Sequence, residues 1–255
     1  MAVPQYRLIS FDRQMGVGVT GSMQATISAV AKCNGPSAPY CLPNEMICAE
    51  IGRFIRLPVP PCGIIYAPSA TVKTWFATLD FNLAGNRLPP VDPLRCVKEL
   101  PELSAGLLLF DILVGNCDRH GHNFAVDFAA ASPRMSVFDH SHALFGPDAG
   151  GAAARFADLS DRLAISGASK TRGNRHCLLD VIASDAHFGN WFGRISSIPD
   201  FLIADLCRDA QELGATLVEA NLAADFLKYR RDNLQKIVTD HRGEFRAIRQ
   251  WSLIQ

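Results

Sequence analysis

The sequence predicts an α+β fold with two lobes: a small β-rich amino-terminal lobe that contains one helix, and a mainly α-helical carboxy-terminal lobe. Strand patterns and one helix pattern precede residues 74–80, and helical patterns dominate after Leu94. The chain has 255 residues, of which 48% are hydrophobic, so it can bury a substantial core. We place the two domains at residues 1–82 and 83–255, with a hinge over residues 79–85.

Two segments of the amino-terminal lobe have clear patterns. Residues 27–33 alternate small and branched side chains, which predicts a strand that carries Lys32. Residues 44–55 have apolar side chains at helical spacing, at positions 47, 51, 54 and 55, and Glu45 lies at the start of this predicted helix. Asn44 is of a residue type that can cap it.

A glycine-rich stretch precedes this strand. Residues 16–21 match the pattern Gly-x-Gly-x-x-Gly, at a distance from Lys32 that suits a phosphate-covering hairpin. A dinucleotide site would need a strand before this stretch and a helix after it, and neither is predicted. For Gly16 and Gly18 an ordinary turn is an equal alternative. The backbone amides of Gly21 and Ser22 could meet phosphate oxygens.

The carboxy-terminal lobe begins with a long apolar run. Residues 107–114 predict a buried helix that ends at residues 115–116, where Gly-Asn follows. Residues 123–128 and 134–139 then alternate apolar and polar side chains, which predicts two strands joined by a turn at 129–133. Such a hairpin would bring Asn123 and Asp139 side by side at its open end.

Three polar residues around this hairpin have the order and spacing of a phosphoryl-transfer site. Asp118 can accept a hydrogen bond from an attacking hydroxyl, and Asn123, five positions later, can bind a metal without adding charge. Asp139 can bridge a magnesium ion and phosphate oxygens. Each residue alone is better explained by a turn or a strand end. Their combination indicates a kinase.

The same region resembles a known family. Residues 110–120 resemble the catalytic loop of the HipA-like kinases of bacteria, and residues 138–144 resemble their metal-binding segment. The phosphatidylinositol kinases share a related pattern. Three further segments are similar to the family's Asn-Glu helix, its Leu-Pro-Val-Pro junction and its closing helix: residues 43–45, 57–61 and 226–234. The resemblance implies a two-lobed protein-kinase-like fold.

The resemblance also implies roles for single residues. Asp118 would be the catalytic carboxylate, and Lys32 with Glu45 would form the ion pair that orients the phosphates of ATP. Glu50 is a rival partner for Lys32, although it lies further along the predicted helix. The metal ligands for Mg²⁺ would be Asn123 and Asp139.

Other residues would support the nucleotide and the loops. Gly21 and Ser22 would join Lys32, Asn123 and Asp139 in binding ATP. His120 and His140 would orient the catalytic loop and the metal-binding carboxylate. Phosphorylation of Ser22 would compete with the phosphates of ATP for the same amides, which makes autophosphorylation there a possible brake.

The implied function is transfer of the γ-phosphate of ATP to a protein serine or threonine, as in HipA-like toxins. Lipid or small-molecule hydroxyls are alternative acceptors. Because the chain is too short to include the additional amino-terminal domain of these toxins, a companion subunit or an antitoxin is an expected partner.

Two other functions use the same residues. Histidine pairs at 120 and 122 and at 140 and 142 could bind zinc with Cys117 or Asp139, as in a metal-dependent hydrolase. A pseudokinase that binds a nucleotide or a partner without turnover is the second alternative. It is suggested by the unusual glycine-rich loop and by the short stretch between Lys32 and Asn44.

Composition limits the partners. Lysine plus arginine and aspartate plus glutamate both number 25, so charge does not favour nucleic acid or an anionic membrane. The 8 cysteines include no Cys-x-x-Cys pair, which is typical of reduced thiols in the cytosol. No signal peptide or membrane-spanning run is visible, so we expect a cytoplasmic protein.

The last part of the sequence contains a glycine-rich segment and a long helical stretch. Residues 146–151 are rich in glycine and are a candidate mobile loop at the substrate entrance, or else an ordinary surface loop. In the last helical stretch four large side chains are spaced to form one buried stripe, at residues 222, 226, 229 and 237. Four charged residues of this stretch are expected to face water: Arg230, Arg231, Asp232 and Lys236.

Overall fold

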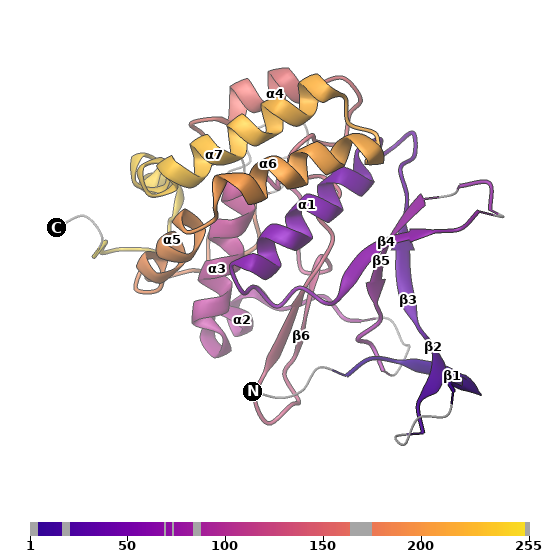
Figure 1. Cartoon of the computed structure of the whole chain (residues 1–255). Helices are drawn as coiled ribbons and strands as arrows, with labels where there is room; N and C mark the ends of the chain where they lie inside the picture. Colours follow the sequence, from indigo (N-terminus) through magenta and orange to yellow (C-terminus); the bar gives the residue numbers. More distant parts are fainter. Residues whose placement is uncertain are drawn as a thin grey trace.

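The computed structural model has the α+β architecture that the sequence predicts, and it describes residues 5–16, 21–68, 70–72, 74–83, 88–163 and 175–252. Strands β1 to β5 lie on one side of a body of helices, and the β6 hairpin projects between the two (Figure 1). The division into domains at residues 82 and 83 stays a prediction.

The amino-terminal strands form two separate antiparallel units. Strands β1 (Leu8–Gln14) and β2 (Met23–Ile27) make a two-stranded ribbon, and a three-stranded sheet has the order β3-β5-β4. The bounds of its strands are Ala29–Lys32 for β3, Cys62–Tyr66 for β4 and Thr74–Leu79 for β5. Lys32 ends β3 opposite Phe76 of β5. The predicted strand around Lys32 is therefore confirmed, with shorter bounds.

Helix α1 (Cys41–Phe54) starts three residues before the predicted helix. Asn44 therefore does not cap it, and that expectation was wrong. The cap comes instead from Asn34, whose Oδ1 accepts a hydrogen bond from Leu42 N at 2.8 Å. Pro43 lies in the first turn, where the missing N–H costs no helical hydrogen bond. In Figure 1, α1 lies beside α6, and the two helices are in contact.

The helical body surrounds helix α3 (Pro101–Leu113). Gly115, with φ of +63°, ends α3 where the sequence predicted, because a residue with a side chain rarely adopts this conformation. The predicted hairpin is confirmed as β6 (Phe124–Asp127) and β7 (Arg134–Val137), with Phe124 opposite Val137. The other helices are α2 (Pro93–Glu99), α4 (Ala152–Leu159), α5 (Phe188–Ser196), α6 (Asp200–Asp209), η1 (Ala210–Leu213), α7 (Leu217–Asp240) and η2 (Arg242–Glu244).

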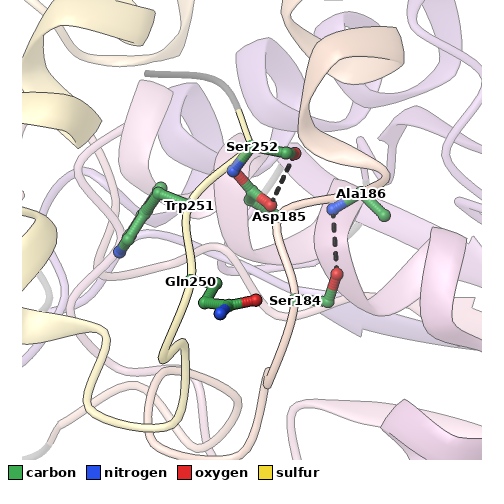
Figure 2. Close-up of a pocket in the computed structure, with 6 residues that line it drawn as sticks. All are labelled: Ser184, Asp185, Ala186, Gln250, Trp251 and Ser252. Atoms are coloured by element: carbon green, nitrogen blue, oxygen red, sulfur yellow. Dashed lines mark hydrogen bonds between the residues drawn. The ribbon is translucent and has the colours of Figure 1, made fainter. Parts of the chain in front are cut away.

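The last described residues are tied to the helical body. Ser252 donates two hydrogen bonds to the carboxylate of buried Asp185, from its backbone N at 2.7 Å and from its Oγ at 2.9 Å (Figure 2). A pocket of about 590 Å³ lies between these two segments, and its lining consists of residues 184–186 and 250–252. It contains none of the residues that the sequence assigns to phosphoryl transfer.

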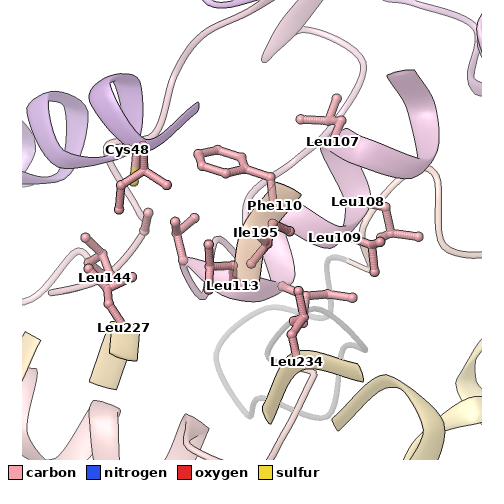
Figure 3. Packing of buried hydrophobic residues seen from close by; sticks show 14 of the residues in the cluster. Cys48, Leu107, Leu108, Leu109, Phe110, Leu113, Leu144, Ile195, Leu227 and Leu234 are labelled. Atoms are coloured by element: carbon pink, nitrogen blue, oxygen red, sulfur yellow. The ribbon is translucent and has the colours of Figure 1, made fainter. Parts of the chain in front are cut away.

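One continuous apolar core joins the two predicted lobes. Cys48 of α1 packs together with side chains of α3 such as Phe110 and of α7 such as Leu234 (Figure 3). Helix α1 thus belongs by sequence to the amino-terminal domain but shares its core with the carboxy-terminal helices. A helix anchored in this way holds its polar residues at a fixed position relative to the hairpin β6–β7.

Helix α7 differs from the predicted pattern at three positions. One is Arg231, which was expected to face water but has a side chain that is only 10% exposed and donates to Ile198 O at 2.7 Å. Phe226 and Ile237 are buried as expected, but Tyr229 is 41% exposed and Arg230 is fully buried.

The expectation that Arg230 faces water was therefore wrong. Its guanidinium donates to backbone carbonyls at the ends of two helices, among them Ile112 O at 2.5 Å and Leu159 O. Each of these carbonyls also accepts from one backbone N–H just past the end of its helix: Gly115 N for Ile112 O and Arg162 N for Leu159 O, both at 3.2 Å.

All eight cysteines are free thiols. None of the helices in the described ranges is long and apolar enough to cross a membrane.

Candidate active site

The centre of the candidate site is Lys32, which meets two carboxylates at once. Its Nζ lies 2.6 Å from Glu45 Oε1 and 2.7 Å from Asp139 Oδ1. Strand β3, helix α1 and the residues after β7 therefore converge on one point. Glu50, the rival partner, lies on the exposed side of α1 and pairs with Arg53 at 3.0 Å.

The charges of this triad stabilise one another. Burial disfavours the charged form of all three groups, but the attraction between them outweighs it. The pKa of Asp139 is lowered to about 2, mainly by the Lys32 ammonium, and the pKa of Glu45 is lowered by hydrogen bonds and charge from His140 and Lys32. The two carboxylates in turn raise the pKa of Lys32. All three groups are ionised at neutral pH.

Asp118 and Asn123 face each other across the catalytic loop. Asn123 Nδ2 donates to the backbone oxygen of Asp118 at 2.7 Å and lies 3.5 Å from its Oδ2. The backbone N–H of Asp118 donates to Asn116 Oδ1 at 3.2 Å, which fixes the turn. Because the amide nitrogen of Asn123 is used in this way, its Oδ1 is the end of the side chain that can face a cation.

Arg119 joins this loop to the segment that carries Asp139, and the sequence analysis missed it. The side chain is almost fully buried at 1% exposure. Its Nη1 donates to Phe138 O at 2.6 Å and to the backbone oxygen of Asn123. One guanidinium thus holds the two ends of the β6–β7 hairpin together. This bond explains how Asn123 and Asp139 come to the same end of the hairpin.

A buried carboxylate neutralises Arg119. Asp111 accepts from Arg119 Nε at 2.8 Å and Nη2 at 3.0 Å, from Asn116 Nδ2 at 2.9 Å and from His176 Nε2 at 2.9 Å. Burial opposes ionisation, yet Arg119 and His176 hold the pKa of Asp111 well below its usual range. The sequence contained one sign of this network: Asp111 is a charged residue within the otherwise apolar run 107–114.

The tautomer of His176 follows from its two partners. Its Nδ1 accepts from Leu178 N at 3.1 Å, so Nε2 carries the proton that is donated to Asp111. Burial lowers the pKa of this imidazole, which is therefore neutral. Cys177 N also donates to Arg119 O at 3.1 Å, so this segment braces the catalytic loop from behind.

The backbone at Asp139 has an uncommon conformation. Its φ is +63°, in the left-handed region that residues with a side chain seldom adopt. Ser141 Oγ donates to Asp139 Oδ1 at 2.9 Å. Arg155 of α4 links the following residues to the catalytic loop, since its Nη2 donates to Gly115 O at 2.7 Å and to His142 O at 3.1 Å.

Sequence comparison identifies this region. Residues 31–150 match the family model of the HipA-like kinases. The match spans a little less than half of the chain, and this region is what is similar to the family. The match includes all five residues that the sequence assigned to the reaction and its metal: Lys32, Glu45, Asp118, Asn123 and Asp139. A kinase function is therefore supported for the chain.

One solved structure supports the fold. The structure of a Helicobacter pylori proinflammatory kinase, CtkA, matches with a TM-score of 0.53 and 13% identity over 92% of this chain and 96% of that chain. HipA of Shewanella oneidensis MR-1, solved in a toxin–antitoxin complex with HipB and operator DNA, matches with a TM-score of 0.43 and 13% identity, over 94% of this chain and 74% of that chain. No curated protein sequence matches the chain.

The histidines of the kinase region have different surroundings. His140 is buried, its Nδ1 lies 3.3 Å from Glu45 Oε2, and its ring stands perpendicular to that of Phe110. His120 is exposed, and its Nδ1 accepts from His122 N at 3.2 Å. Among the described residues, no three histidine, cysteine or acidic side chains form a cluster that could hold a metal, so the geometry gives no support to a zinc hydrolase.

The glycine-rich stretch lies partly outside the described residues, whereas the segment after Asp139 is described throughout. Gly16 and Gly21 have φ of +60° and +61°, and Met15 N donates to Ser22 O at 2.7 Å, which closes the loop. Gly18, and residues 84–85 of the predicted hinge, lie outside the described residues. The segment 146–151 is tied to the helical body, because Gly150 N donates to Tyr40 Oη at 3.1 Å.

Proposed function

We propose that the chain is a Mg²⁺-dependent kinase that transfers the γ-phosphate of ATP to a serine or threonine of a protein. The observation that carries this proposal is the triad of Lys32, Glu45 and Asp139, held 2.6–2.7 Å apart beside the Asp118–Asn123 loop. A lysine fixed between two ionised carboxylates can exchange one of them for a phosphate oxygen without losing its charge partner.

Each side chain has a separate task in the proposed reaction. Asp118 would accept a hydrogen bond from the attacking hydroxyl and align it with the phosphorus atom. Asn123 Oδ1 and the Asp139 carboxylate are oxygen donors of the kind that Mg²⁺ prefers, and they would hold the ion. When bound, that ion neutralises charge on the phosphate groups. Lys32, kept in place by Glu45, would donate to phosphate oxygens.

The remaining assignments depend on the same proposal. The amides of Gly21 and Ser22 would contact phosphate oxygens, and a phosphorylated Ser22 would block them. His140 would hold Glu45 in place through its Nδ1. We further propose that the protein acts in the cytoplasm and binds a companion subunit or antitoxin. Isolation from the native host without any bound protein would contradict the partner.

The test is ATP turnover with Mg²⁺ by the wild type, Asp118→Asn and Asp139→Asn. We expect each variant to lose turnover by about 10²–10⁴-fold, because each loses a group that acts in the transition state. Asp180→Asn is a matched control, since Asp180 is an exposed carboxylate that pairs with Arg175 away from the site. Circular dichroism would check that all variants are folded.

The outcomes distinguish the candidate functions. Equal turnover by the wild type and both site variants would refute the proposed catalytic roles. A wild type that binds ATP without turnover would be a pseudokinase, the second candidate. In that case Lys32 would stay permanently paired with Asp139. Labelled phosphate transferred to proteins of a host lysate would identify the acceptor, and labelled lipid instead would contradict the protein substrate.

A further inference from the structure

Helix α1 directs two adjacent polar residues at the segment that follows β7. Glu45 holds Lys32, whereas Asn44, also fully buried, reaches the backbone of residues 141–146. Asn44 Nδ2 donates to Ser141 O at 2.8 Å and lies 3.5 Å from Gly146 O, and its Oδ1 accepts from Phe145 N at 3.1 Å. One amide thus holds both ends of this segment.

The segment 141–146 has little regular structure of its own. Two turn hydrogen bonds lie along it, from Ala143 N to His140 O and from Gly146 N to Ala143 O, and one bond joins Leu144 N to Val114 O. Asn44 is the side chain of α1 that bonds to this backbone. Its amide is of the right type, because it can donate to carbonyls and accept from an N–H at the same time.

Asp139 needs such support. A left-handed backbone conformation at a residue with a side chain is unfavourable, and it persists only where the surrounding structure enforces it. On the amino-terminal side, Arg119 holds Phe138 O. On the carboxy-terminal side, Asn44 holds Ser141 O, while the hydroxyl of Ser141 bonds to the Asp139 carboxylate at 2.9 Å.

We propose that Asn44 is a positioning residue for the metal-binding carboxylate of Asp139. The inference rests on the proposed function, because it takes Asp139 as a ligand of the Mg²⁺ that accompanies the nucleotide. Asn44 acts through Ser141 and touches neither metal nor substrate. It thereby gives α1 a second task besides the Lys32–Glu45 pair: one helix fixes both the phosphate-binding lysine and the metal-binding carboxylate.

The test measures metal binding directly, without turnover. Mn²⁺ is titrated into the protein with saturating ADP, and bound Mn²⁺ is followed by electron paramagnetic resonance. In Asn44→Asp a carboxylate would face Ser141 O and Gly146 O, which it cannot donate to. We expect Mn²⁺ affinity to fall by about 10–100-fold, the effect that is typical of residues that orient a metal ligand.

Asn34→Asp is the matched control. Asn34 uses its amide in the same way at the start of the same helix, since its Nδ2 donates to Leu213 O at 2.7 Å and its Oδ1 accepts from Leu42 N at 2.8 Å. It has no bond to the segment 141–146. We expect Mn²⁺ affinity within twofold of the wild type for this control.

A second variant, Asn44→Ala, addresses the two ways in which Asn44→Asp could mislead: it could fail to fold, or its added charge could alter metal binding. Asn44→Ala adds no charge and leaves room for water, so it replaces Asn44→Asp if circular dichroism shows that the latter is unfolded. It also separates lost positioning from an added negative charge near the metal. Asn44 variants with wild-type Mn²⁺ affinity, or a loss of the same size in Asn34→Asp, would overturn the inference while the proposed function stands. A wild type that binds no Mn²⁺ with ADP would overturn both.

Discussion

Arg119 provides the strongest test of how the catalytic loop is held together. Asp111 is fully buried, and Arg119 supplies two of the four hydrogen bonds that its carboxylate accepts. In Arg119→Met the carboxylate would keep only Asn116 and His176 as donors. Phe138 O would also lose its partner. The variant therefore leaves a buried charge without its counter-ion.

The expected cost is large. Removing one partner of a buried ion pair destabilises a protein by about 3–5 kcal/mol. Since a domain is stable by about 5–15 kcal/mol, Arg119→Met should stay folded but lose a large part of this free energy of unfolding. For a chain of this size the melting temperature should fall by roughly 6–20 °C, at about 2–4 °C per kcal/mol. The same substitution at Arg208, which is 64% exposed, should change stability by less than about 0.5 kcal/mol.

Urea unfolding at pH 7.5, followed by circular dichroism, measures these differences. In the double variant Asp111→Asn with Arg119→Met the unpaired charge is gone, so its loss should be smaller than the sum of the two single losses. A loss below about 1 kcal/mol for Arg119→Met would refute the reasoning, and so would strict additivity in the double variant.

Two further predictions concern the same loop. His176 is buried and neutral, with a lowered pKa, so below about pH 6.5 the unfolded chain takes up a proton that the folded chain excludes. The contribution of His176 to the free energy of unfolding is therefore complete above that pH. It is lost as the pH falls, by at most about 1.4 kcal/mol per pH unit. Urea unfolding at pH 7.5 and 5.5 should show a smaller pH dependence in His176→Gln than in the wild type, and an equal dependence would contradict the prediction. In Gly121→Ala the added Cβ would lie 2.7 Å from Val91 O, so the catalytic loop must shift and ATP turnover should fall at least about tenfold, since small misplacements of reacting groups are costly. Gly193→Ala meets nothing within 4 Å and is the control, and equal turnover by the two alanine variants would show that the loop tolerates the change.

Local patterns in the sequence predicted the elements that carry the candidate site. The strand that ends at Lys32, the apolar helix that ends before Gly115 and the hairpin after Asn123 are all present. Each of these depends on periodicity or on a glycine at a fixed offset, which act over a few residues. The pairing of Lys32 with Glu45 is present as well, at 2.6 Å.

Polar residues with partners far along the chain were misjudged. Arg230 is of a residue type that usually faces solvent on a helix, yet it is buried, and its guanidinium donates to backbone carbonyls more than 60 residues away. Asn44 is of a residue type that often caps a helix, yet its hydrogen-bond partners lie about 100 residues away. Asn34 instead accepts the hydrogen bond from Leu42 N at the start of the helix. A sequence pattern contains no information on such partners.

The sequence by itself determined which groups can do chemistry: the carboxylates, the amide and the lysine whose types and spacing indicate phosphoryl transfer. Only the tertiary structure decided which distant groups surround them, namely the Asp111–Arg119 pair behind the loop and Asn44 bonded to Ser141 O after Asp139. The physical reason is that residue type and spacing are local properties of the chain. Satisfying a buried charge or a buried carbonyl, in contrast, depends on whichever distant segment the fold brings within hydrogen-bonding distance.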